Sequence, residues 1–238
     1  MNTEYGKNWD EFYKKTYFER KSKALWDVNS ENSVQMDLPY FRKYFNNNLP
    51  VMDVGCGTGE QTAFLAKIYP KVIAVDAAKS AIEFATEHNV IDNVVWQVLD
   101  ITNSEQCARI HSEFGDLNIY MRGVMHQIEM NEIDYMIGNL RDLMGISGKL
   151  YFVEVKDKIR EYFKSLDNSF LSLPEQMLEV FVSNLPPRGL STELINEYFN
   201  DSIFEILDKG DCTLRTNLKL PNGKPLEIPA VYGVIGTI

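Results

Sequence analysis

The 238-residue sequence is poor in cysteine, in basic residues and in long apolar runs, and each shortage argues against a class of protein. Its three cysteines lie far apart and form no C-x-x-C pair, so neither a disulfide framework nor a zinc site is indicated. Only 24 lysines and arginines face 34 acidic residues, and the net charge of −10 repels nucleic-acid phosphates. No apolar run has the length of a membrane span, and the polar amino terminus is unlike a secretion signal. We therefore expect a cytoplasmic protein that binds neither nucleic acid nor membrane.

Short β-rich runs alternate with helical patterns between residues 51 and 155. This alternation predicts right-handed crossovers and a parallel sheet with helices on both faces. Two later strand patterns flank Pro221-Asn222-Gly223, a hairpin signal, and predict an antiparallel edge. The expected fold class is α/β, a doubly wound, seven-stranded, mostly parallel sheet. The expected strands are 51–54, 72–75, 94–99, 117–121, 150–155, 203–220 and 226–238, and the expected helices between and after them include 62–68, 81–88, 105–114, 133–144 and 192–199.

Four segments make up the single domain that we expect over residues 1–238. Residues 1–47 form an N-terminal helical cap whose aromatic residues, at spacings of three and four, lie on one helical face. Residues 48–155 form the core, and 191–238 form a final helix and the edge hairpin. Residues 156–190 are too apolar for a solvated loop and too long for a tight connection, so they are interpreted as a helical lid insertion.

A glycine-rich loop, Gly55-Cys56-Gly57-Thr58-Gly59, follows the first expected strand. Such a loop before a helix presents backbone N–H groups above the sheet. A dinucleotide-binding loop would place its third glycine at position 60, where this chain has Glu60. The lysine of a nucleotide-triphosphate loop is missing too, so both phosphate interpretations are weakened. We interpret the Cys56 thiol as a small filler of the loop and not as a nucleophile.

Acidic residues end the first three strands, namely Asp53, Asp76 and Asp100. Their order with the glycines resembles that of the class I S-adenosylmethionine (SAM)-dependent methyltransferases. The resemblance covers roughly residues 48–155 and is strengthened by Gly148-Lys149-Leu150 before the fifth strand. Each aspartate alone could be a turn former or a helix cap. Three in register favour a site for SAM, with S-adenosylhomocysteine (SAH) as the product.

The resemblance implies a role for each cofactor residue. Asp53 would lie near the cationic methionine end, and Asp76 would accept hydrogen bonds from the ribose hydroxyls. Asp100 would accept from the adenine amine, while Ile101 offers a backbone N–H and an apolar side chain. The backbone after the fourth strand would face the methionine part. The full expected cofactor set is Asp53, Gly55, Cys56, Gly57, Asp76, Ala77, Asp100, Ile101, Arg122 and Gly123.

His126 is the first candidate to face the methyl acceptor, with Glu129 and Glu154 behind it. Methyl transfer from a sulfonium is a direct displacement that alignment can accelerate strongly, so a general base is useful but optional. The alternative for His126 is a packing or capping role in the turn. His126 and Glu129 have helical spacing but no evident third ligand, and we expect no metal.

The chain lacks the sequence motifs of several methyltransferase classes, which argues against their acceptors. Methyltransferases that act on exocyclic amines of nucleic-acid bases carry Asn/Asp-Pro-Pro-aromatic after the fourth strand, where this chain has Met121-Arg122-Gly123-Val124. No cysteine follows a proline, as in cytosine C5 enzymes. We therefore expect transfer to an O, N, S or C atom of a small molecule, with specialised metabolism as one setting. The alternatives are a protein or peptide methyltransferase and a non-catalytic SAM-binding sensor or partner subunit.

The expected acceptor pocket is roofed by the cap and the lid. Trp9, Tyr13 and Tyr17 offer flat faces that suit an apolar, aromatic or cationic substrate, and the alternative is that they only bury core. Arg188 can bind a carboxylate of the acceptor, and the alternative is that its side chain is simply solvated. The sequence does not predict the oligomeric state. The expected substrate-pocket residues are Trp9, Tyr13, Tyr17, His126 and Arg188.

Overall fold

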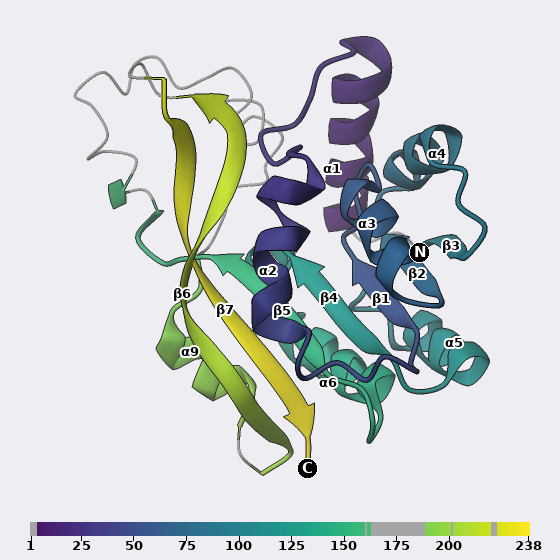
Figure 1. Ribbon diagram of the computed structural model, residues 1–238, viewed down its shortest axis with the longest axis vertical. Coiled ribbons are helices and arrows are strands. Elements are labelled where there is room, and N and C mark those ends of the chain that lie inside the picture. The colour runs from purple at the N-terminus through teal and green to yellow at the C-terminus, as the bar shows by residue number, and fades with distance from the viewer. Residues whose placement is uncertain (1–3, 160, 163–188, 201, 220–222) are drawn as a thin grey trace.

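The computed structural model describes residues 4–159, 161–162, 189–200, 202–219 and 223–238, and these form a seven-stranded sheet (Figure 1). The strand order is β3-β2-β1-β4-β5-β7-β6. β7 runs antiparallel to both β5 and β6, whereas β1 to β5 pair in parallel. The strands are β1 (Val51–Val54), β2 (Val72–Asp76), β3 (Val94–Val98), β4 (Asn118–Arg122), β5 (Leu150–Val155), β6 (Phe204–Lys219) and β7 (Pro225–Thr237).

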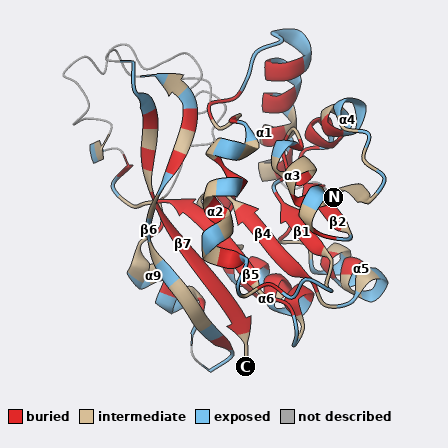
Figure 2. Ribbon diagram, in the orientation of Figure 1, coloured by how far each residue is buried: buried red, intermediate tan, exposed pale blue. Residues whose placement is uncertain are grey.

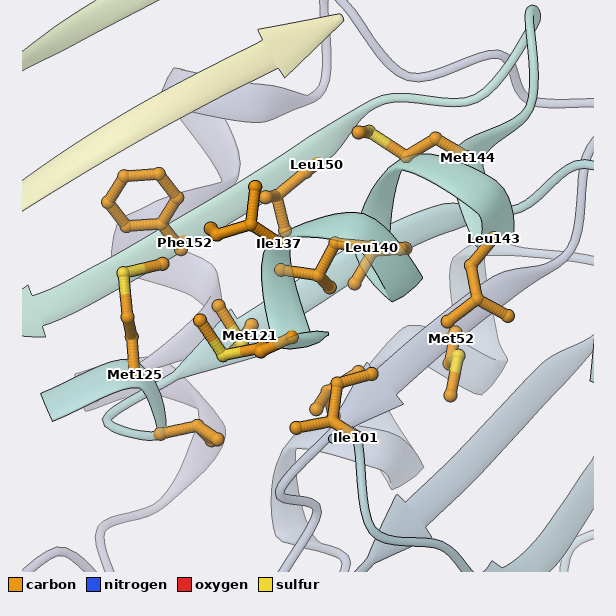
Figure 3. Close-up of a cluster of buried hydrophobic side chains, with 14 of the residues drawn as sticks. Met52, Ile101, Met121, Met125, Ile137, Leu140, Leu143, Met144, Leu150 and Phe152 are labelled. Carbon is orange, nitrogen blue, oxygen red and sulfur yellow. The ribbon is translucent and has the colours of Figure 1, made fainter. Parts of the chain in front are cut away.

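Helices cover both faces of this sheet. Buried residues of α5, α6 and α9 share one apolar cluster with the sheet, and those of α2 and α3 share another. Figure 3 shows the first cluster, in which Ile137 and Leu140 of α6 pack near Phe152 of β5. The helices are α1 (Glu4–Tyr13), α2 (Val34–Phe41), α3 (Glu60–Ile68), α4 (Lys79–His88), α5 (Ser104–Phe114), α6 (Ile133–Met144) and α9 (Thr192–Tyr198).

Strands β1, β2 and β5 are buried along their whole length, and Figure 2 shows buried residues in red. Because helices cover both faces of the sheet, the sequences of β1, β2 and β5 are mostly apolar and do not alternate between apolar and polar residues. Three carboxylates interrupt these runs near the carboxyl ends of the strands: Asp53 in β1, Asp76 in β2 and Glu154 in β5. Burying a charge is costly unless it is paired or hydrogen-bonded, so these positions mark a site.

The N-terminal helix α1 lies beside α4 (Figure 1). The Ser80 backbone N–H donates to Asp10 Oδ1 at 2.7 Å, and the Ser80 hydroxyl donates to the Asp10 carbonyl at 2.9 Å. After α1 the chain continues into a π-helical turn, η1 (Lys14–Glu19). These bonds hold the aromatic face of α1 close to the carboxyl end of β2.

The long hairpin of β6 and β7 contacts the segment between η1 and α2. The Asn217 backbone N–H donates to the Leu25 carbonyl at 3.0 Å, and its side-chain amide donates to the Ala24 carbonyl at 2.6 Å. Arg215 Nη1 donates to Asn32 Oδ1 at 2.7 Å. The hairpin and the N-terminal segment therefore meet on the far side of the carboxyl edge from α4.

The expected fold class is confirmed, and each expected strand and helix is found with bounds shifted by at most two residues. Most of the expected lid insertion, residues 160 and 163–188, lies outside the described residues, as do residues 220–222 of the expected hairpin turn. Among the helices of the described part, none has both the length and the apolar character of a membrane span.

Two buried tyrosines offer a matched test of the core. Tyr120 donates to Asp37 Oδ2 at 2.7 Å, whereas the Tyr151 hydroxyl, stacked nearby, has no partner among the described residues. We expect Tyr151→Phe to raise the free energy of unfolding by about 1 kcal/mol and Tyr120→Phe to lower it by about 2 kcal/mol. Urea denaturation measures both changes. A loss of stability in Tyr151→Phe would show that its hydroxyl is satisfied.

Candidate functional site

The carboxyl ends of β1, β2, β4 and β5 meet at a cavity of about 190 Å³. Parallel strands present these ends at one edge of the sheet, and the strand order changes direction between β1 and β4, where ligands of such sheets bind. The glycine loop forms the floor, α1 one wall, and the β6–β7 hairpin the opposite wall. Residues from four distant parts of the chain therefore line one space.

The glycine loop adopts a backbone that side chains cannot follow. Gly55 and Gly57 have φ angles of +73° and +53°, in the left-handed region. A Cβ on Gly57 would lie 2.8 Å from the Tyr13 hydroxyl, and one on Gly55 would collide with Val124. The Gly57 N–H donates to Asp76 Oδ2 at 3.0 Å. The loop thus brings bare backbone to the cavity and is tied to the end of β2.

Two carboxyl groups beside this loop are hard to ionise. Burial raises the pKa of Asp53 to about 7, which the hydrogen bond from the Thr62 hydroxyl opposes and the charge of Asp76 reinforces. Burial likewise raises the pKa of Asp76 to about 6, against the hydrogen bonds that the Ala78 and Gly57 N–H groups donate. No salt bridge to either aspartate is found among the described residues. The floor of the cavity therefore favours a cationic ligand.

The third strand-end aspartate is oriented differently. Asp100 Oδ1 accepts from the backbone N–H of Thr102 at 3.0 Å and from its hydroxyl at 2.8 Å. Asp100 is not among the residues that line the cavity, although its neighbours Leu99 and Ile101 are. Ala77 lines it as well.

His126 is fixed by a buried carboxylate. Its Nδ1 lies 2.6 Å from Oε2 of Glu154, a residue with no exposed surface. The backbone N–H groups of Val124 and Met125 donate to Glu154 Oε1 at 3.0 and 2.8 Å, and that of His126 donates to Oε2 at 3.3 Å. His126 lines the cavity, whereas Glu129 is exposed and does not. The structure thus joins His126 to Glu154, while Glu129 lies outside the cavity lining.

Arg122, the last residue of β4, carries a second role that sequence reasoning missed. The expectation concerned its backbone, but Arg122 lines the cavity as a residue whose guanidinium forms an ion pair with Asp37 of α2, with Nη1 to Oδ2 at 2.7 Å. Burial lowers its pKa, but the Asp37 charge outweighs this and the pKa is raised, so the side chain stays cationic. No sequence signal links these residues, which are 85 positions apart.

Aromatic side chains of the N-terminal segment form the wall over the glycine loop. Trp9 and Tyr13 line the cavity as expected, and so do Tyr5 and Trp26, which were missed although Tyr5 continues the helical spacing of the stripe. Tyr17 lies behind this wall, stacked on Tyr13 and bonded to Asp27. Arg188, the remaining expected pocket residue, lies outside the described residues.

Comparison with known proteins agrees with this arrangement. A family model described as a methyltransferase domain matches residues 51–148. A solved SAM-dependent methyltransferase from Anabaena variabilis ATCC 29413 is 37% identical, with a TM-score of 0.93, over 99% of this chain and 96% of that one. This chain belongs to the SAM-dependent methyltransferases. It is therefore an enzyme, and SAM is its cofactor.

Other similarities to this methyltransferase are weaker. Malonyl-[acyl-carrier protein] O-methyltransferases of Bacillus anthracis and Bacillus cereus are each 28% identical, over 133 and 131 residues. These matches span about 55% of this chain but only 45% of the relatives, less than half of their length. A structure titled for the conversion of a disulfide bond into a thioacetal in echinomycin biosynthesis shares the fold, with a TM-score of 0.67 at 17% identity over 96% of this chain and 92% of that one.

The cavity of the methyltransferase suits the charge of SAM. The cofactor carries a sulfonium and an ammonium, and Asp53 and Asp76 supply carboxylates with no cationic partner among the described residues. The Gly55–Gly57 backbone lines the cavity without side chains of its own at positions 55 and 57. Within the described residues, no group of three or more histidine, cysteine, aspartate or glutamate side chains is placed to hold a metal ion.

The raised pKa values predict pH-dependent binding of the cofactor. Asp53 and Asp76 lose charge as pH falls through about 7 and 6, so attraction for the ammonium that SAM and SAH both carry should weaken in the same range. We expect SAH affinity to rise about tenfold between pH 5.5 and 7.5. Calorimetry over this range measures it, and Asp53→Asn should remove the part of the rise above pH 6. An affinity independent of pH in the unaltered protein would contradict this prediction.

Proposed function

We propose that this methyltransferase transfers the SAM methyl group to a small-molecule acceptor that enters the same cavity from the side of the β6–β7 hairpin. One observation carries the proposal. The glycine loop and Asp76 line the same cavity as His126 and apolar residues of the hairpin. A cavity of this kind places donor and acceptor next to each other without a further conformational element.

The half of the cavity beside the glycine loop is proposed to hold SAM. When bound, SAM supplies an electrophilic methyl group on its sulfonium. Asp76 would accept from the ribose hydroxyls, and Asp53 would face the ammonium, directly or through water. Ile101 and Leu99 would contact the adenine ring, and the backbone of Arg122 and Gly123 would face the methionine part. In the structure Asp100 bonds Thr102, so an adenine contact requires its second oxygen.

His126 is proposed as the general base of the acceptor half. Because Glu154 accepts from Nδ1, the proton of a neutral imidazole is held there, and Nε2 keeps a free lone pair. Nε2 has no partner among the described residues, and the ring lines the cavity. His126 can therefore take a proton from a hydroxyl or amine acceptor, while Glu154 positions the ring and stabilises its cationic form.

The relatives support a runner-up in which the acceptor is carried on a protein. Their names describe methylation of a malonyl group on an acyl-carrier protein. The matched part is less than half of those proteins, so the acceptor does not carry over with it. Incubation with methyl-labelled SAM and a cell extract separates the two. Label in the small-molecule fraction supports our proposal, and label confined to protein overturns it.

The cofactor half has its own test. Asp76→Ala removes the acceptor of the proposed ribose hydrogen bonds, which are charge-assisted, and should weaken SAH binding about a hundredfold. Asp76→Asn keeps one carbonyl oxygen as an acceptor, so its SAH affinity should fall less than that of Asp76→Ala. Calorimetric titration of both variants with SAH measures the difference. Unchanged affinity in Asp76→Ala would remove Asp76 from the cofactor site.

The role of His126 predicts a separation of turnover from cofactor binding. We expect His126→Gln to lower turnover at least about a hundredfold, because proton removal is lost, with SAH affinity within about twofold of the unaltered protein. His111→Gln is the matched control. His111 lies on α5, pairs with Asp116 and does not line the cavity. The label-transfer assay gives turnover. Normal turnover in His126→Gln would exclude a base at this position.

A further inference from the structure

The guanidinium of Arg122 uses only part of its hydrogen-bonding capacity. Nη1 donates to Asp37 Oδ2, and the same oxygen accepts from the Tyr120 hydroxyl at 2.7 Å. Neither Nε nor Nη2 has a partner among the described residues. These two nitrogens form one edge of the planar group, with N–H bonds that point the same way.

This unused edge is not sealed inside the protein. The buried side-chain nitrogens and oxygens that lack a partner belong, within the described residues, to Trp9, Tyr69 and Tyr151, and no atom of Arg122 is among them. Arg122 lines the cavity, and its side chain retains 13% exposure. Nε and Nη2 therefore keep accessible surface, on a residue that lines the space in which the acceptor is proposed to lie.

We infer that the acceptor carries a carboxylate, and that the Nε–Nη2 edge of Arg122 binds it with two parallel hydrogen bonds. The inference rests on the proposed function, which places a small molecule in this cavity. An arginine edge matches the two oxygens of a carboxylate in spacing and direction, and charge-assisted bonds of this kind are about twice as strong as neutral ones. Arg122 is thus the residue that selects acidic acceptors.

The other cation of the cavity is less suited to this role. Arg215 donates from Nε to Glu227 Oε1 at 2.9 Å and from Nη1 to Asn32 Oδ1 at 2.7 Å. Each pair of neighbouring nitrogens in its guanidinium therefore includes one that is already hydrogen-bonded. Its side chain is also 35% exposed, which weakens any charge interaction through solvent screening. Among the described residues Arg122 has one hydrogen-bonding partner, and its side chain is less exposed than that of Arg215.

The other residues that line the cavity indicate the chemical character of the rest of the acceptor. Buried aliphatic side chains from the N-terminal segment, the end of β5 and the hairpin line the cavity beyond Arg122, and none of them offers a hydrogen bond. An acceptor that fits both parts has a carboxylate at one end and an apolar body. These aliphatic residues are Leu25, Val155, Ile159, Leu214 and Ile228.

Equilibrium binding of a simple probe pair tests the inference. With the full chain saturated by SAH, we expect octanoate to bind at least about tenfold more tightly than octanamide, which has the same shape without the charge. Isothermal titration calorimetry gives both affinities. Equal affinities for octanoate and octanamide would overturn the inference.

The Arg122 variant is designed so that the buried carboxylate of Asp37 does not lose its ion-pair partner. Arg122→Gln by itself would strand Asp37, so it is combined with Asp37→Asn, and the double variant should bind both probes within about twofold. Asp37→Asn alone and Arg215→Gln should each keep the preference for octanoate. A double variant that also keeps it would show that Arg122 is not the carboxylate site.

The cofactor has a carboxylate of its own, and this provides the decisive control. If Arg122 binds the acceptor, SAH affinity in the double variant stays within about threefold of that of the unaltered protein. A tenfold or greater loss would assign Arg122 to the methionine carboxylate and overturn the inference. Because these readouts are binding and not turnover, the octanoate preference is measured independently of whether an extract yields a methylated small molecule.

Discussion

The buried carboxylate of Glu154 is the interaction on which the acceptor side of the site depends. It stands at the end of β5 with no exposed surface, and a charge so placed is stable only if it is well hydrogen-bonded. Three consecutive backbone N–H groups and one imidazole provide these bonds. They fix the loop after β4 against β5, and with it the left-handed turn at Gly123 and the orientation of His126.

Polar contacts between distant segments set the walls of the cavity, while apolar packing supplies most of the stability. Asp10 and Ser80 join α1 to α4, and Asn217 joins the hairpin to the segment after η1. Each contact is directional, so it determines where a wall stands and not merely that it is buried. The two apolar clusters on either side of the sheet hold the strands whose ends carry the site.

The sequence predicted the fold closely because both of its signals are local. Alternating strand and helix patterns depend on neighbouring residues, and strand-end carboxylates such as Asp53 and Asp76 are recognisable from their position alone. The pairing of Arg122 with Asp37 joins β4 to α2 across the fold, and no periodic pattern in the sequence indicates it. Asp100 bonds Thr102 two residues on, a local preference of aspartate that competes with an outward orientation. Tyr17 shares the helical spacing of Tyr13, yet the π-helical turn places it in a second layer.

The close approach of Tyr13 to Gly57 makes the aromatic wall and the glycine loop a single fitted surface. The hydroxyl of Tyr13 lies where a side chain at position 57 would begin. A side chain at position 57 would therefore require the Tyr13 ring to move, and a smaller residue at position 13 would leave a gap over the loop. The residue at position 57 is therefore restricted twice, by its own left-handed backbone and by the aromatic wall that α1 places above it.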